Sequence, residues 1–223
     1  MNLQPTLQPR SPEETYGPAL DQAHQAFPQL NPEAVTARAG VDYHATSSDK
    51  GTFRIPFLGT LYHVAWPAGD VWCVADESRQ PADVTTTLIL LHYLITADGS
   101  PMADNWVAFR SLPGGLGYEA AFHGRASGRI ERAFGNDCQA FQEAARAVGG
   151  EPLTFGDASF AFRALPRLWM AAILYLADDE FPASGSILFD GSAPHYLPTE
   201  DLAVLGGLLA SRLIKAARAL AHE

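Results

Sequence analysis

Cysteine is scarce in this sequence, which has only Cys73 and Cys138 among its 223 residues. The two residues belong to no CxxC pair and have no metal-ligand spacing, which excludes a zinc or iron–sulfur site built from thiolates. The sequence allows a disulfide between them, but it favours two buried thiols, because free cysteine is among the most buried residue types. This usage is typical of a reducing, cytoplasmic environment.

Long apolar runs are also lacking. The longest, residues 168–177, is far shorter than the roughly 20 residues that a membrane helix needs. Residues 1–14 contain no apolar segment and no cleavage-site pattern, so no signal peptide is expected. We therefore expect a soluble, cytoplasmic protein that does not contact a membrane.

Basic residues are few as well. Fifteen Lys and Arg against 25 Asp and Glu give a formal net charge of −10, and the chain has no dense run of basic residues. Nucleic-acid binding needs a basic surface that releases counterions, so we expect no nucleic-acid partner and consider a small molecule or another protein instead. Hydrophobic residues make up 47% of the chain, which is enough for a packed core.

Common motifs of catalysis and nucleotide binding are missing too. The chain contains no GxGxxG, P-loop, GxSxG, paired-histidine or Dx[DN]xDG pattern. Histidine-rich metal sites, Rossmann-type dinucleotide binding and the α/β-hydrolase mechanism therefore have no support. Whether the protein is an enzyme stays open at this point, and so does its cofactor.

Periodicity predicts the fold class. Apolar residues at positions i, i+4, i+7 and i+11 from Val84 predict a helix over residues 83–97. A second helix over residues 200–221 is expected to begin with Thr199 as its cap, and strand-like runs occupy 41–74 and 159–190. We predict an α+β protein with a single domain at residues 40–223, in which an antiparallel or mixed sheet is covered by these helices. Residues 1–39 are expected to form an arm and short helices.

Carboxylates gather in the second half of the chain. Two apolar runs end in acidic residues and a helix opens with two more, which gives the set Asp178, Asp179, Glu180, Asp190, Glu200 and Asp201. Several converging oxygen ligands can hold Mg²⁺ or Ca²⁺, so one hypothesis is a metal-dependent hydrolase or transferase. The other is that residues 178–180 form a turn and that Glu200 and Asp201 stabilise the helix dipole. For Glu180 and Asp190 we expect partly buried, hydrogen-bonded carboxylates, with Asp190 accepting from the turn at residues 191–193.

Two arginines and a histidine suggest a ligand site. Arg110 precedes a Pro-Gly-Gly turn and Arg167 follows a proline, so each guanidinium is expected to have a fixed position in which it can bind an anionic group. His92, within the helix at 83–97, is either a metal ligand or base, or a satisfied, half-buried residue. The leading hypothesis is thus a small-ligand-binding or accessory module with an aromatic-lined pocket between sheet and helices.

Several short segments resemble a prokaryotic family known as domain of unknown function 3786, over about residues 40–215. The segments are 90–94, 106–110, 112–115 with Tyr118, 134–135, 149–150, 156–157, 165–167, 178–182, 188–190 and 196–197. The resemblance implies an anaerobe-enriched group in which some members carry an extra iron–sulfur domain with clustered cysteines. Two scattered cysteines cannot supply that cluster, so none is expected here. Polar residues inside these segments form the candidate site: His92, Arg110, Tyr118, Arg167, Asp179, Glu180 and Asp190.

Overall fold

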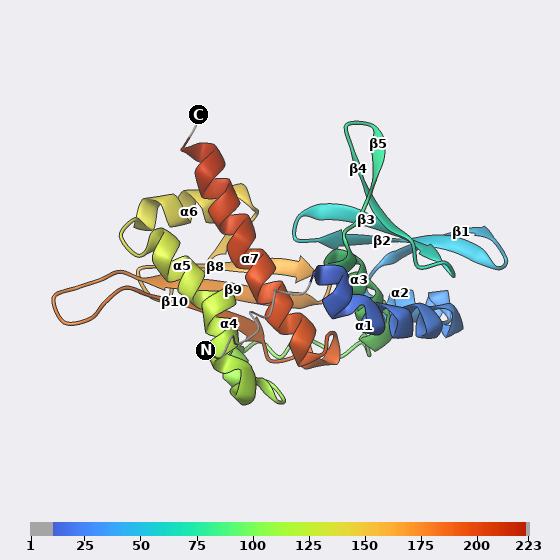
Figure 1. The fold of residues 1–223 in the computed structure, drawn as a ribbon, viewed down its shortest axis with the longest axis horizontal. Coiled ribbons are helices and arrows are strands. Elements are labelled where there is room, and N and C mark those ends of the chain that lie inside the picture. Colours follow the sequence, from blue (N-terminus) through green and yellow to red (C-terminus); the bar gives the residue numbers. More distant parts are fainter. Residues whose placement is uncertain (1–10, 222–223) are drawn as a thin grey trace, which may run out of the picture.

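The computed structural model describes residues 11–221, which fold into two lobes, each built around its own sheet (Figure 1). We call residues 11–97 the first lobe and residues 105–221 the second lobe. Both sheets are five-stranded and antiparallel, in the orders β1-β2-β3-β4-β5 and β6-β10-β9-β8-β7. The fold is α+β, as the sequence predicts.

The first lobe is a strand meander covered by helices. Its elements are α1 (Pro12–Ala26), α2 (Pro32–Ala39), β1 (Asp42–Ser47), β2 (Lys50–Phe57), β3 (Thr60–Trp66), β4 (Val71–Ala75), β5 (Ser78–Pro81) and α3 (Val84–Thr96). Ser11 begins α1 with a capping box to Glu14, and Asn31 caps α2. The expected short helices therefore exist, and Phe27 and Val35 pack into the core. The expected arm lies largely in residues 1–10, outside the described residues.

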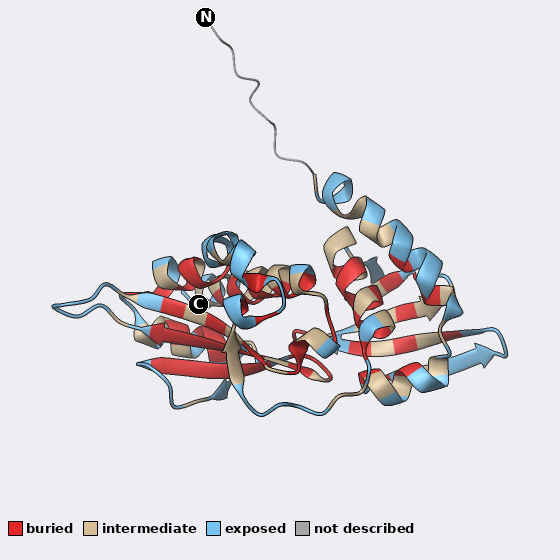
Figure 2. Ribbon diagram, turned by 90° about the horizontal axis from the view of Figure 1, so that it is seen from below, coloured by how far each residue is buried: buried red, intermediate tan, exposed pale blue. Residues whose placement is uncertain are grey.

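The second lobe is a sheet with helices on one face (Figure 2). Its elements are β6 (Trp106–Ala108), α4 (Glu119–Arg125), α5 (Ser127–Phe134), α6 (Cys138–Ala147), β7 (Glu151–Pro152), β8 (Ala158–Leu165), β9 (Leu168–Tyr175), β10 (Ser184–Asp190) and α7 (Thr199–Leu220). Helices α5 and α6 contact the strands, and α7 packs across α4, α5 and α6. None of the helices in residues 11–221 has the length and apolar character needed to span a bilayer.

The arrangement of the strands corrects one expectation. The sequence predicts a single sheet, but strands 42–81 and strands 106–190 form two. Within each group the connections that join successive paired strands are short, so these strands pair as hairpins. Helix α3 and the segment after it separate the groups. One continuous cluster of buried residues nevertheless spans both lobes, which is consistent with a single domain.

Helix α7 contains neighbouring glycines with opposite surroundings. A Cβ on Gly206 would lie 2.5 Å from Cε2 of Phe122, whose ring stacks on Phe109 with centroids 4.2 Å apart. A Cβ on Gly207 would meet only the carbonyl oxygen of Arg125, at an ordinary 3.5 Å. Gly206 thus allows close packing of α7 on Phe122, whereas Gly207 fills no such role.

Alanine should consequently have opposite effects at the two positions. Gly206→Ala should lower the free energy of unfolding by about 1–3 kcal/mol, because an overpacked core must shift. Gly207→Ala should raise it by roughly 0.5–1 kcal/mol, because glycine is a poor helix former. Urea unfolding of both variants measures the difference. Equal effects of the same sign would show that Phe122 does not pack against Gly206.

Candidate functional site

One histidine–aspartate pair joins the two lobes, and a second joins the segment between the lobes to the second lobe. Nδ1 of His92 on α3 lies 2.5 Å from Oδ2 of Asp201 on α7, and Nδ1 of His195 lies 2.7 Å from Oδ2 of Asp98. The first pair is largely buried, with Asp201 only 8% exposed, while the second is about half exposed. Because residue 92 contacts 201 and residue 98 contacts 195, the two segments run alongside each other in opposite directions. His92 is therefore half-buried and hydrogen-bonded, the simpler of its two expected roles.

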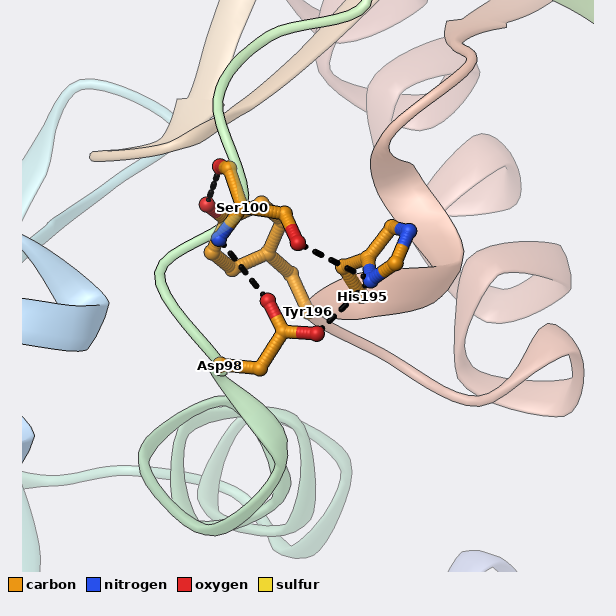
Figure 3. A network of polar contacts seen from close by, with 4 residues as sticks. All are labelled: Asp98, Ser100, His195 and Tyr196. Carbon is orange, nitrogen blue, oxygen red and sulfur yellow. Dashed lines mark hydrogen bonds and ion pairs between the residues drawn. The ribbon is translucent and has the colours of Figure 1, made fainter.

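The outer pair includes a serine but does not form a catalytic triad (Figure 3). Ser100 Oγ lies 3.1 Å from Nδ1 of His195, the same nitrogen that contacts Asp98. In a triad the carboxylate and the serine occupy different ring nitrogens, so that the histidine can take the serine proton. Here both contact one nitrogen. The Tyr196 hydroxyl donates to the carbonyl oxygen of Ser100, which gives the segment at Ser100 a second connection to residues 195–196.

Tyr93 and Arg167 connect the two lobes by further hydrogen bonds. The Tyr93 hydroxyl donates to the carbonyl oxygen of Ala39 at 2.6 Å and accepts from the backbone N–H of Arg167 at 3.1 Å. Burial raises the pKa of Tyr93 well above its ordinary value, so it stays a neutral donor. The Arg167 guanidinium donates to the carbonyl oxygen of Ala37. A candidate ligand-binding arginine thus contacts the backbone of the other lobe.

Asp190 lies at the end of β10 and organises the next turn. Its Oδ1 accepts from the backbone N–H of Ser192 at 2.9 Å, from the Ser192 hydroxyl at 2.5 Å and from the N–H of Ala103 at 2.9 Å. Burial raises the pKa of Asp190, but these hydrogen bonds lower it by more, so the pKa lies below its ordinary value. The expected buried, hydrogen-bonded carboxylate accepting from residues 191–193 is confirmed.

The contacts that Asp98 makes with Ser100 and His195 predict that the stability of the fold depends on pH. The backbone N–H of Ser100 and the side chain of His195 lower the pKa of Asp98 from 3.8 to about 2. A group whose pKa is lower in the folded state stabilises it fully above the unfolded pKa and loses that contribution as pH falls. The contribution of Asp98 should therefore disappear between about pH 4 and pH 2. Thermal melts of the wild type and Asp98→Asn should converge over this interval; parallel curves would contradict the assignment.

The other carboxylates of the acidic set are spread over separate places. Oδ1 of Asp178 accepts from the N–H groups of Glu180 and Phe181, which makes the expected turn. Asp179 and Glu180 are exposed in the loop between β9 and β10, so the expected partial burial of Glu180 is wrong. The turn extends away from the core, because Phe181 is itself 65% exposed. In residues 11–221, no three His, Cys, Asp or Glu side chains converge as metal ligands.

The arginines expected to share an anion occupy different parts of the second lobe. Arg110 is exposed just beyond β6, and Arg167 lies in the β8–β9 turn. Trp106 pairs with Asp190, and β6 runs from there toward Ser186, away from the end of the sheet that carries Arg167. A hydrogen bond holds the loop after Arg110 instead, because the Thr199 hydroxyl donates to the Pro113 carbonyl oxygen at 2.7 Å. Thr199 makes this contact from inside α7, whose cap is Pro198. The prediction that Thr199 is the helix cap is therefore wrong.

A cleft of about 730 Å³ opens between α1, α4 and α7. We call it the helical cleft. Phe109 and Phe122 form its aromatic lining together with Tyr118, and small residues of α7, notably Gly207, leave the space open. Arg125 and Arg129 contribute positive charge, and Glu200 lies at the start of α7. Tyr118 is the sequence-predicted candidate that lines this cleft, and it is 60% exposed.

Comparison with known proteins identifies the family. The family model described as Domain of unknown function (DUF3786) matches residues 31–212. The chain belongs to this family. No curated protein and no solved structure matches the chain significantly. Membership in this family therefore assigns no reaction to the chain.

Sequence reasoning missed most of the helical cleft. Arg125 lies on α4 and Arg129 on α5, and they line one cleft with α7 and the first turn of α1, an arrangement that no local pattern encodes. One signal was available: the pair Gly206-Gly207 inside a strong helix pattern, which often marks a packing or functional site. The two cysteines are free and half-buried, so the favoured thiols are confirmed while their full burial is not.

Proposed function

We propose that this protein is a small-molecule-binding module and that its ligand occupies the helical cleft. The volume of about 730 Å³ carries the proposal. Sites for small molecules usually measure about 300–1,000 Å³ and combine apolar walls with a few placed polar groups. The lobe junction is not a site of this kind, because its polar groups form hydrogen bonds with one another.

The lining indicates the chemistry of the ligand. The partly buried side chains of Val204 and Leu208 on α7 offer an apolar wall, and the stacked, almost fully buried rings of Phe109 and Phe122 pack behind it. Polar contacts can come from the Tyr16 and Tyr118 hydroxyls and from Arg125. Such a site favours a molecule with an apolar or aromatic body and a polar, anionic end, since guanidinium groups pair well with anions.

A substitution that fills the cleft tests this proposal. N-phenyl-1-naphthylamine, a neutral apolar fluorophore, should bind the wild type, and Gly207→Leu should weaken binding at least tenfold by occupying the space. Gly207→Ala, with a much smaller side chain, is the matched control and should bind nearly as the wild type does. Fluorescence titration measures all three. Equal binding by a folded Gly207→Leu protein would overturn the proposal.

The metal-dependent hydrolase or transferase has no comparable support. It requires three carboxylates of the acidic set to meet, whereas Asp178 caps a turn, Asp190 holds Ser192 and Asp201 contacts His92. No observation in the described part of the chain favours this second function.

A further inference from the structure

A basic groove of about 410 Å³ lies between α5 and α7, next to the helical cleft. Four cationic side chains line it: Arg129, Arg132, Lys215 and Arg218. Arg129 and Ser211 line both the groove and the cleft. The two hollows are therefore neighbours that share a wall, one apolar and aromatic, the other basic.

The charge of this groove is unusual for the chain. The protein has only 15 Lys and Arg residues against 25 Asp and Glu, yet four of the 15 surround one small groove. In residues 11–221, no Lys or Arg lies within 4.0 Å of a carboxylate oxygen; the ion pairs found there all use histidine. Glu131, the acidic residue of α5, is engaged elsewhere by the backbone N–H of Gly185. The positive potential of the groove is thus not neutralised by ion pairs.

Helix geometry explains how the cations gather. Arg129 and Arg132 are three residues apart on α5, and Lys215 and Arg218 are three apart on α7, so each pair shares one helix face. The helices pack side by side and bring the pairs together. The sequence has no dense run of basic residues, and these four cations come together only in the folded chain.

Arg129 is held rigidly in the shared wall. Its Nη1 donates to Ser211 Oγ at 2.7 Å and to the carbonyl oxygen of Gly207 at 3.3 Å. Those contacts use one end of the guanidinium, and the planar group carries further N–H donors in a fixed fork. A fixed arginine loses little entropy when an anion binds, which makes it a suitable anchor.

We propose that the ligand carries a phosphate or polyphosphate group, which the basic groove binds while the apolar body occupies the helical cleft. This inference rests on the proposed function. A phosphomonoester carries about two negative charges near neutral pH and several strong acceptor oxygens, which suits four cations better than a single carboxylate does. Arginine binds phosphate oxygens in bidentate fashion. The ligand class is therefore a phosphorylated amphiphile, either a free metabolite or a lipid.

Calorimetry with three probes separates the two sites. Decyl phosphate has both parts, decyl glucoside has the apolar chain with a neutral head, and inorganic tripolyphosphate has the anion alone. The wild type should bind decyl phosphate at least tenfold more tightly than decyl glucoside, and this preference should shrink as salt is added. The double variant Arg132→Gln/Arg218→Gln should lose the preference while binding decyl glucoside as the wild type does.

Control variants make the outcomes distinct. Lys50→Gln/Arg54→Gln removes the same charge from the first lobe and should keep the phosphate preference. Gly207→Leu should bind neither alkyl probe well but should retain tripolyphosphate. A preference that survives Arg132→Gln/Arg218→Gln, or no preference in the wild type, overturns this inference alone. Failure of every apolar probe to bind at the cleft overturns the proposed function instead.

Vesicles distinguish the two sources of the phosphate. If the head group belongs to a lipid, the protein should co-sediment with vesicles containing phosphatidic acid and not with pure phosphatidylcholine. If it belongs to a free metabolite, decyl phosphate should bind while neither vesicle carries the protein down. Both results support recognition of a phosphorylated amphiphile. Co-sedimentation that is equal for both vesicles would contradict it, because the protein would then not distinguish the anionic phosphomonoester of phosphatidic acid from the zwitterionic phosphodiester of phosphatidylcholine.

Discussion

Asp190→Ala should lower the free energy of unfolding by about 2–4 kcal/mol, one of the largest single-residue effects expected in this protein. One carboxylate oxygen accepts three hydrogen bonds, two from Ser192 and one from the N–H of Ala103. Asp190 is only 2% exposed and Ser192 only 3%, so water cannot readily replace the lost acceptor. Buried donors left without a partner account for most of the expected cost.

Urea unfolding at pH 7 measures this effect. Asp190→Asn keeps a carbonyl oxygen at a similar place but loses the charge, so its cost should lie between that of alanine and zero. Asp179→Ala removes an exposed carboxylate from the loop at the opposite end of β10 and should change stability by no more than about 0.5 kcal/mol. Similar small losses for Asp190→Ala and Asp179→Ala would show that the Ser192 turn does not depend on Asp190.

Local sequence signals predicted the elements well but could not predict how the sheets divide. The helical periodicity after Val84 corresponds to α3, and the strand-like runs predicted within residues 159–190 correspond to β8, β9 and β10. Such signals depend only on residues close together in the chain, so they can be recognised in a single sequence. The division of strands into two sheets depends on which hairpins pair across the chain, and no local pattern encodes that choice.

The candidate residues show the same limit. The role of Asp190 could be predicted because its partner Ser192 is two residues away. Asp201 was expected to serve the helix dipole, yet its partner His92 is 109 residues earlier in the chain. The basic groove arises in the same way, since it needs α5 beside α7. Contacts between distant segments therefore carry most of what the sequence did not predict.

The two polar regions of the molecule have different properties. At the lobe junction, His92, Asp98 and Asp190 bond to protein groups, which suits a structural connection. Along α7, the helical cleft and the basic groove leave cationic and aromatic groups facing open space. Substitutions at the junction should accordingly affect stability first, and substitutions along α7 should affect binding first.

The His92–Asp201 pair provides the sharpest test of that division. Asp201→Ala should lower the free energy of unfolding by about 2–3 kcal/mol, because the 2.5 Å contact is largely buried and links α3 to α7. A double-mutant cycle with His92→Ala isolates the pair and should give a coupling energy of about 1–2 kcal/mol. The exposed pair of Asp98 and His195 is the matched control, and its coupling should be much smaller because solvent screens it. Equal coupling in the two pairs would contradict the role of burial.

Binding of N-phenyl-1-naphthylamine by folded Asp201→Ala should match the wild type; a tenfold loss would instead place the junction within the binding site.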